Sequence, residues 1–511
     1  MNYFISGKLA AAIDKHTIND IGIPSIVLME RAAFAVVEET VKFYDSDIKT
    51  GDIVIFCGKG NNGADGMAVS RILFQKGYNV KVIIAGEPDR VTEEFALQSD
   101  ILKKLGVKIS ILRKMEDVFK LNFDNCSLII DGLFGIGLTR EITGLNYELI
   151  KRINDEKKKV ISIDIASGLD SLKGLEMGIA VNADITVTFG YPKAGHIICN
   201  GKKYTGRLIV HDIGFCVPEN FEFNEIDDLS KHLFEGIKDN ELVKLPKRTK
   251  ISNKGTYKNI NIIGAGENMS GAVALAGEAA YRCGCGLVKI FASENNINPL
   301  KCLIKEAVIC GYDKLDIEKF DIDKDIIIVG PGLSVSRQAE EILGIVLKSD
   351  CKKIIDADAL NIISRNKILL ENFDENTIIT PHIKEMSRLI DKDVSYIREN
   401  IIECAKEFSK RYKCITIIKD ATSVVASCDG KVRINATGNS GMSKGGSGDV
   451  LTGIIAGMLS QGMNSYEGAC LGVCLHGLAG DIASRELSEY GMVASDIISA
   501  LPKIFLNISD K

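Results

Sequence analysis

Short runs of β-branched residues alternate with amphipathic helical stretches in the first part of the chain, and this alternation restricts the fold more than any other feature. The clearest runs are IVIFC (53–57), VKVII (80–84), SLIID (127–131), VISIDI (160–165) and ITVTF (185–189). Strands that alternate with helices form parallel sheets with right-handed crossovers. The pattern therefore predicts an α/β domain built on a Rossmann-like parallel sheet.

The same rhythm restarts after a charge-rich, poorly periodic segment at 217–250. The new runs are NINIIG (259–264), LVKIF (287–291), DIIIVG (325–330), KIIDAD (353–358), TIIT (377–380) and CITIIK (414–419), followed by SVVAS (423–427) and KVRIN (431–435), which we expect to be antiparallel. A long helical segment closes the chain. We expect a first domain at 1–215, a linker at 216–245 and a second α/β domain at 246–511.

Composition excludes several classes of protein. The chain has 511 residues, 46% of them hydrophobic and 26% charged, as in ordinary globular proteins. A net charge of −5 gives no basic field, so we expect neither nucleic acid nor a membrane surface as partner. The apolar stretch 450–466 contains polar residues and predicts a buried helix rather than a membrane span.

Cysteine usage indicates a reducing compartment. The 14 cysteines are dispersed without a CxxC pair, and with the six histidines they form no zinc-ligand pattern. Such cysteines are typical of reduced, core-filling thiols. The N-terminus lacks the apolar core of a signal peptide. We therefore predict a cytoplasmic protein.

A glycine-rich turn, GKGNNGADG (58–66), leads from the first strand into a helix. Backbone N–H groups at such a turn form a cradle for phosphate, although the sequence lacks the GxGxxG fingerprint. The alternative is a tight turn with an asparagine N-cap.

Acidic residues follow two later strands of the same domain: Asp131 ends one, and Asp164 ends the next, shortly before Ser167. Ligands of open α/β sheets lie outside the carboxyl ends of the strands, so these side chains should converge with Asn62. Oxygen ligands suit a hard cation, and a carboxylate left off the metal is a candidate general acid/base. The alternative is that both aspartates cap helices.

Three motifs, GKGNNGADG (58–66), DGLFGIGLTRE (131–141) and DIASGLD (164–170), together resemble those of the NAD(P)H-hydrate epimerase family, of the YjeF N-terminal type. The resemblance covers about residues 1–215. It implies K⁺ ligands at Asn62, Asp131 and Ser167. The family usually has proline where this chain has Ala166, so the turn before Ser167 lacks a fixed φ. Implied substrate contacts are Asn61, Asn62, Gly63, Ala64, Asp65, Gly135, Ile136, Gly137, Leu138, Thr139, Arg140, Glu141 and Asp164.

The most specific motif of the second half is NSGMSKGGSGD (439–449), which precedes an apolar helix. Its backbone N–H groups can form an anion hole for a transferring phosphoryl group, aided by the helix dipole. Asp449 is then placed to take a proton from a substrate hydroxyl. The alternative is a glycine-rich loop with an N-cap aspartate.

This loop resembles the ribokinase-like superfamily, and further motifs narrow the resemblance to the ADP/ATP-dependent NAD(P)H-hydrate dehydratase family over about residues 245–505. These motifs are NKGTY (253–257), MSGAVALAGEAAYRCGCGLV (269–288), VGPGLS (329–334), DADALN (356–361), TPHIKEMSRL (380–389) and KDATSVV (419–425). The resemblance implies substrate contacts from Ala272, Gly332, His382 and Asp449. It implies nucleotide contacts from Lys419, Asp420, Ala421, Thr422, Ser423 and Gly448.

Some residues depart from the family pattern or allow a structural interpretation. Asp420 stands where the family often has glycine, and its charge would repel phosphate, so we expect it to face the sugar or solvent. His382 follows a proline and has a purely structural alternative. Asp356 and Asp358 either position Mg²⁺ or substrate, or cap the next helix.

The resemblance implies a mechanism. Hydrated NAD(P)H carries a hydroxyl on its reduced nicotinamide ring, and phosphorylation turns that hydroxyl into a leaving group that the ring nitrogen expels. We expect Asp449 to deprotonate the hydroxyl, the loop amides to stabilise the phosphoryl group, and Mg²⁺ to neutralise the donor, ADP (or ATP). Asp164 is the expected general acid/base of R/S epimerisation, through an iminium or ring-opened species.

The predicted partners are NADHX, NADPHX and ADP, and we expect a homo-oligomer. One rival interpretation is a ribokinase-like small-molecule kinase, of a hydroxyethylthiazole or pyrimidine type, fused to a nucleotide-binding Rossmann module. A second is a binding or regulatory protein whose first domain only senses nucleotide. A stable phosphorylated product would favour the kinase, and hydrate binding without epimerisation would favour the sensor.

Overall fold

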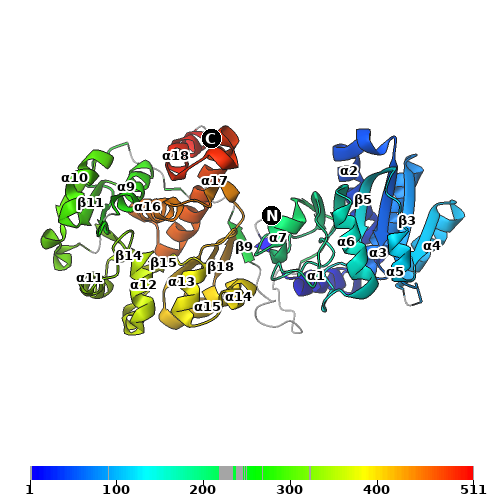
Figure 1. Ribbon diagram of the computed structural model, residues 1–511, viewed down its shortest axis with the longest axis horizontal. Coiled ribbons are helices and arrows are strands. Elements are labelled where there is room, and N and C mark those ends of the chain that lie inside the picture. The colour runs from blue at the N-terminus through cyan, green and yellow to red at the C-terminus, as the bar shows by residue number, and fades with distance from the viewer. Residues whose placement is uncertain are drawn as a thin grey trace. The chain divides into compact units, whose positions relative to one another are not determined.

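The computed structural model describes residues 3–89, 91–217, 234–237, 245–246, 248, 250–267, 269–321 and 324–509. The chain forms two compact units, Tyr3–Phe234 and Glu235–Lys511, which run from blue to green and from green to red in Figure 1. Most of the expected linker at 216–245 lies outside the described residues.

The first unit is built on a parallel sheet with the strand order β4-β3-β2-β5-β6-β7-β8. This order reverses direction between β2 and β5, as in Rossmann folds. The fold class predicted for this half is therefore confirmed. The strands of this sheet are β2 (Asp52–Cys57), β3 (Asn79–Ala85), β4 (Lys108–Leu112), β5 (Cys126–Gly132), β6 (Lys159–Ile163), β7 (Ile185–Phe189) and β8 (Arg207–His211), and the short strand β1 (Tyr3–Phe4) is not part of it.

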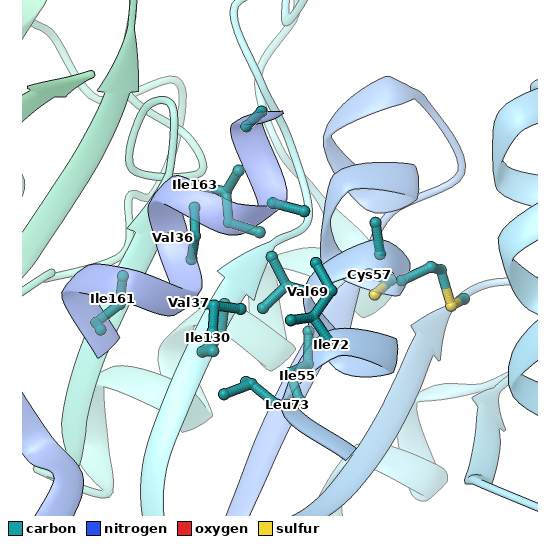
Figure 2. Packing of buried hydrophobic residues seen from close by; sticks show 14 of the residues in the cluster. Val36, Val37, Ile55, Cys57, Val69, Ile72, Leu73, Ile130, Ile161 and Ile163 are labelled. Atoms are coloured by element: carbon teal, nitrogen blue, oxygen red, sulfur yellow. The ribbon is translucent and has the colours of Figure 1, made fainter. Parts of the chain in front are cut away.

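Helices cover both faces of this sheet, which explains why every residue of β2 is buried. On one face, Ile55 and Cys57 pack against apolar side chains of α2 and α3, among them Val36, Val37 and Val69 (Figure 2). On the other face, alternate strand residues pack with α5 and α6. The helices are α1 (Gly7–Asn19), α2 (Ser25–Ile48), α3 (Asn61–Gln75), α4 (Glu93–Lys104), α5 (Met115–Phe119), α6 (Gly144–Asp155) and α7 (Gly201–Thr205).

The second unit contains a larger, mixed sheet with the order β9-β18-β17-β16-β15-β14-β13-β10-β11-β12. The strands β16, β15, β14, β13, β10, β11 and β12 are all parallel to their neighbours. In contrast, β17 pairs antiparallel with both β16 and β18, as the sequence predicts. The strands are β9 (Phe234–Ile237), β10 (Asn259–Ile263), β11 (Leu287–Ala292), β12 (Val308–Gly311), β13 (Asp325–Val329), β14 (Lys352–Ile355), β15 (Thr377–Ile379), β16 (Ile415–Ile418), β17 (Val424–Ala426) and β18 (Val432–Asn435).

The helices of the second unit bury the faces of this sheet. They are α9 (Ser270–Arg282), α10 (Glu294–Leu303), α11 (Arg337–Leu347), α12 (Asp358–Arg365), α13 (Ile383–Ile390), α14 (Val394–Glu399), α15 (Ile401–Tyr412), α16 (Ser447–Ser460), α17 (Ser465–Gly491) and α18 (Ala494–Ser509). Residues 450–460 of α16 are all buried, so the buried helix predicted over 450–466 is confirmed up to Ser460, where α16 ends and a partly exposed turn leads into α17. Within the described residues, no helix has the length and apolarity needed to cross a membrane.

Candidate active sites

The glycine-rich turn of the first unit lies at the point where the strand order reverses, between the carboxyl ends of β2 and β5. A Cβ at Gly58 would lie 1.8 Å from the carbonyl oxygen of Leu133, and one at Gly63 would lie 2.0 Å from the carbonyl oxygen of Gly58. Backbone atoms cannot yield to such contacts, so only glycine allows this turn to lie directly on the end of β5.

A cavity of about 970 Å³ opens above this turn. Of the predicted substrate-binding residues, it is lined by Asn61, Asn62, Asp65, Gly135, Ile136, Gly137, Leu138, Thr139, Arg140 and Asp164. Gly63 and Ala64 are buried in α3 and do not line it. Glu141 lines a separate polar cavity of about 550 Å³ with Glu176 and Lys203. The structure therefore brings together most of the predicted contacts but separates Glu141 from them.

Asp131 lies fully buried at the end of β5 and is surrounded by donors. Its carboxylate accepts hydrogen bonds from the Ser162 hydroxyl, at 2.8 Å, from the Ser167 hydroxyl and backbone N–H, at 2.5 and 2.9 Å, and from the Leu133 N–H, at 3.2 Å. Burial raises the pKa of Asp131, and these hydrogen bonds oppose the rise. The carboxylate thus joins the ends of β5 and β6.

The side-chain amide of Asn62, one of the implied K⁺ ligands, contains a buried polar atom that no protein group among the described residues satisfies. Asn62 is 8% exposed, and its Nδ2 is buried without a hydrogen-bond partner in the structure. Rotating the amide by 180° places its oxygen at that position, where a cation would satisfy it. The other two ligands that the resemblance implies, the Ser167 hydroxyl and the Asp131 carboxylate, are buried and hydrogen-bonded to each other. All three groups offer oxygen atoms, the ligand type that suits a hard cation such as K⁺.

Asp164 follows β6 in an unusual backbone conformation, with a φ of 64°. Its Oδ1 accepts hydrogen bonds from the ammonium of Lys193 and, at 2.9 Å, from the hydroxyl of Thr188. Burial raises the pKa of Asp164, but the adjacent ammonium outweighs burial, so the net pKa lies below its ordinary value. Asp164 is therefore a carboxylate at neutral pH and available as a base.

His196 hydrogen-bonds to the backbones of both Lys193 and Asp164. Its Nδ1 accepts the backbone N–H of Lys193 at 3.0 Å, so Nε2 carries the proton and donates to the carbonyl oxygen of Asp164, also at 3.0 Å. Burial, reinforced by Lys193, lowers the pKa of His196 to about 3, which keeps the ring neutral. Neither Lys193 nor His196 belongs to a predicted motif. The one available signal was their position, a few residues beyond β7 at the same sheet edge.

Two acidic residues that the sequence analysis missed line the same cavity. Asp14 of α1 and Glu94 of α4 face it together with Asp65 of α3. Burial raises the pKa of Asp65 well above its ordinary value, and the negative charges of Asp164, Asp14 and Glu94 raise it further. The cavity thus combines Asp164, whose pKa is lowered, with Asp65, whose pKa is raised.

In the second unit, consecutive strand ends bring three functional groups to one sheet edge. Asp356 follows β14, His382 follows β15 and Lys419 follows β16. The Nζ of Lys419 lies 2.8 Å from Asp356 Oδ1, and the backbone of Lys419 pairs with that of His382. Burial lowers the pKa of Lys419, but the charges of Asp356 and Glu385 outweigh it, so the net pKa is raised.

The first turn of α16 lies directly over this ion pair. Gly446 has a φ of 91°, and a Cβ at Gly448 would lie 3.3 Å from Lys419 Nζ and 3.8 Å from Asp356 Oδ2. In the same turn, burial raises the pKa of Asp449 to about 6, with Asp356 adding to the rise and Lys419 opposing it. Asp449, Gly448, Lys419 and Asp356 therefore form one cluster, which includes both the predicted base and two predicted nucleotide contacts.

His382 has a structural role as the N-cap of α13. Its Nδ1 accepts the backbone N–H groups of Lys384 and Glu385, while the Glu385 carboxylate accepts the N–H of His382 at 2.9 Å. About half of the His382 side chain remains exposed although its ring caps the helix. Burial raises the pKa of Glu385 to about 7, a further perturbed acid beside Lys419.

The remaining predicted contacts lie on neighbouring segments. Gly332 has a φ of 58°, and a Cβ there would lie 2.8 Å from the carbonyl oxygen of Met269, just before the α9 turn that contains Ala272. Asp420 and Ala421 are exposed, Ser423 is half-buried and Thr422 is buried, between β16 and β17. The charge of Asp420 thus faces outward, one of the two orientations expected for it.

Asp356 and Asp358 already bind other groups of the protein, so they suit Mg²⁺ only if a nucleotide supplies further ligands. Asp356 binds Lys419, and Asp358 Oδ2 accepts the N–H of Ser334 at 2.8 Å. In the part of the chain that the structure describes, no three His, Cys, Asp or Glu side chains form a metal-binding group. Mg²⁺ is commonly held by one or two carboxylates and the phosphates of a nucleotide, and that arrangement fits these residues.

Comparisons with known proteins agree with this division into two sites. One family model, described as YjeF-related protein N-terminus, matches residues 25–195, and another, described as NAD(P)H-hydrate dehydratase, matches residues 260–503. A solved structure of the ADP/ATP-dependent NAD(P)H-hydrate dehydratase from Bacillus subtilis, co-crystallised with ATP and Mg²⁺, is 28% identical, covering 53% of this chain and 97% of its own, with a TM-score of 0.48.

Full-length relatives match both units at once. The bifunctional NAD(P)H-hydrate repair enzyme of Moorella thermoacetica is 32% identical, covering 100% of this chain and 98% of its own. The enzyme of the same description from Dictyoglomus turgidum is 34% identical, covering 94% of each chain. The chain therefore belongs to the family of bifunctional NAD(P)H-hydrate repair enzymes.

Proposed function

We propose that the chain repairs hydrated NADH and NADPH in two reactions. The first unit interconverts the R and S forms of the hydrate, and the second unit dehydrates the S form to NAD(P)H at the expense of ADP or ATP. The observation that carries the proposal is the position of Asp449, in the first turn of α16 and electrostatically coupled to Asp356 and Lys419. The transfer of a phosphoryl group to a hydroxyl requires a helix N-terminus, a lysine and a base of this kind.

Dehydration proceeds through phosphorylation of the ring hydroxyl. Asp449 accepts the hydroxyl proton as the oxygen attacks the terminal phosphorus, and the backbone N–H groups of Gly446–Gly448 stabilise the negative charge on the phosphoryl oxygens. Lys419 adds a fixed positive charge next to Gly448. Mg²⁺, when bound with the nucleotide, neutralises phosphate charge. The ring nitrogen then expels the phosphate to give an iminium ion, and loss of a proton from the neighbouring ring carbon restores the double bond of NAD(P)H.

Epimerisation takes place in the cavity of the first unit. The turn at 58–63 and the start of α3 receive the phosphates of the hydrate, and Asp164 moves the proton of the ring hydroxyl. Thr139 and Arg140 also line this cavity. Asn62, Asp131 and Ser167 would hold K⁺, which would supply positive charge to the site.

The substitution Asp449→Asn tests the proposal. It removes the base while preserving the shape of the side chain, so turnover of the S hydrate with ADP and Mg²⁺ should fall by about 10²–10⁴-fold. The measurement is the recovery of the near-ultraviolet absorbance of the reduced nicotinamide. Asp496→Asn is the matched control, because Asp496 lies in the first turn of α18 and forms no part of the cluster.

Two results would contradict this account. Unchanged turnover in Asp449→Asn would remove Asp449 from the chemistry. A stable phosphorylated product without return of NAD(P)H would favour a small-molecule kinase instead.

A further inference from the structure

Lys193 is a buried lysine to which no motif and no part of the proposed function so far gives a role. Only 2% of its side chain is exposed, yet it lines the cavity of the first unit alongside Asp164. Lysine is almost never fully buried unless it is paired. Its ammonium donates to Asp164 Oδ1 and, at 2.8 Å, to the hydroxyl of Thr188.

One N–H of this ammonium is left over. An ammonium has three donors, and among the described residues Asp164 and Thr188 are its only acceptors. His196 joins the backbones of Lys193 and Asp164 through one hydrogen bond to each, which keeps the two residues side by side at the cavity. The remaining N–H is therefore held ready for an acceptor that enters the cavity.

We propose that Lys193 is a catalytic residue of the epimerase, which donates its third N–H to the hydroxyl oxygen of the bound hydrate while Asp164 moves the proton. The inference rests on the proposed function of the first unit and assigns a second group to its reaction. The acceptor is the oxygen on the ring carbon next to the nitrogen, where water adds to the dihydronicotinamide.

The reaction balances without any further reagent. Asp164 removes the hydroxyl proton, the oxygen forms a C=O bond, and the bond from that carbon to the ring nitrogen breaks with its electron pair moving to nitrogen. Asp164 then gives the proton to the nitrogen. The resulting aldehyde rotates about its C–C bond, and the same steps in reverse close the ring on the other face. Lys193 remains an ammonium throughout.

The ammonium matters most when charge develops on oxygen. As the proton leaves, negative charge grows on the oxygen before the C–N bond is fully broken, and a fixed, buried cation stabilises it without reorganisation. Removing one such donor typically lowers kcat by about 10²–10³-fold. Because the interaction strengthens in the transition state, KM should change much less than kcat.

The test compares Lys193→Met and Lys193→Arg with the control Lys159→Met in the full chain. Lys159 belongs to the same unit and pairs with Asp184 at 3.0 Å, but it stands at the opposite end of β6. The substrate is purified R hydrate, with ADP, Mg²⁺ and excess Asp164→Ala protein as the coupling dehydratase. Thermal melting of each variant measures how much of its first unit is folded, and its own dehydration of S hydrate checks that the second unit is intact.

We expect Lys193→Met to lower kcat for the R hydrate by about 10²–10³-fold with KM within a few-fold. Lys193→Arg keeps a cation beside Asp164 and so preserves folding, but its planar guanidinium cannot place an N–H at the same point, so kcat should still fall at least about tenfold. Lys159→Met should match the wild type.

A wild-type kcat in folded Lys193→Arg or Lys193→Met would overturn the inference. So would a loss of epimerase activity that comes only from a smaller amount of folded protein or from a changed KM. These outcomes differ from failure of the proposed function itself, in which the wild-type chain would convert no R hydrate at all.

Discussion

At the scale of single residues, the ionised form of Asp449 lowers the stability of the folded protein at neutral pH. Burial raises its pKa from the ordinary 3.8 to about 6, so at neutral pH the folded protein contains a carboxylate that its environment disfavours. Between these two values the folded chain binds a proton that the unfolded chain has released. The free energy of unfolding therefore falls as pH rises through this window.

Asp449→Asn should consequently stabilise the second unit at pH 7, by roughly 1–3 kcal/mol, while it abolishes dehydration. The gain should vanish below about pH 4, where both states of the wild-type residue are protonated. Melting curves of the two proteins across this pH range measure it. A stability difference that is independent of pH would show that Asp449 does not carry the raised pKa.

Residues also differ in how far sequence could predict them. Asn62, Asp164, Lys419 and Asp449 follow strands or begin helices within recognisable motifs, so their convergence at sheet edges could be expected from topology alone. Lys193 could not, because its role depends on a turn beyond β7 that places it against Asp164. Glu141 was expected in the substrate cavity, but the chain turns away after Arg140.

At the scale of elements, the contact between α9 and α16 positions the catalytic turn. A Cβ at Gly453 would lie 2.1 Å from the carbonyl oxygen of Ala276, so the two helices approach at a distance that only glycine permits. One turn before Gly453, the same helix places Gly448 and Asp449 next to Lys419. Its pose therefore sets the geometry of the second site.

Gly453→Ala should separate these helices, destabilise the second unit by about 1–3 kcal/mol, and lower dehydration of the S hydrate. The matched control is Gly344→Ala in α11, where a Cβ would meet nothing within 4 Å. There, alanine should stabilise the helix by about 0.5–1 kcal/mol. Equal effects of the two substitutions on melting temperature would contradict the close helix contact.

Element types and order followed from the sequence because both signals are local. β-branched runs between amphipathic stretches predicted parallel sheets, and the short connection from 423–427 to 431–435 predicted the antiparallel pair β17 and β18. The strands β8 (RLIVH) and β12 (VICG), whose apolar runs span only three residues, were not predicted. Their partly exposed residues carry little hydrophobic signal, and only pairing with a neighbouring strand reveals them.

At the scale of the whole molecule, two reactions on one damaged coenzyme are encoded in two units with separate cores. A pocket that binds one stereoisomer leaves the other unused, which is a physical reason to join an epimerase to a dehydratase. It follows that a substitution in one site should leave the chemistry of the other intact.

The most direct test supplies a mixture of R and S hydrates, ADP, Mg²⁺ and K⁺ and follows the return of NAD(P)H absorbance. The wild-type chain should restore all of it, Asp164→Ala only the share present as S hydrate over the same interval, and Asp449→Asn almost none. Full recovery by Asp164→Ala at the wild-type rate, or incomplete recovery by the wild-type chain, would contradict the account.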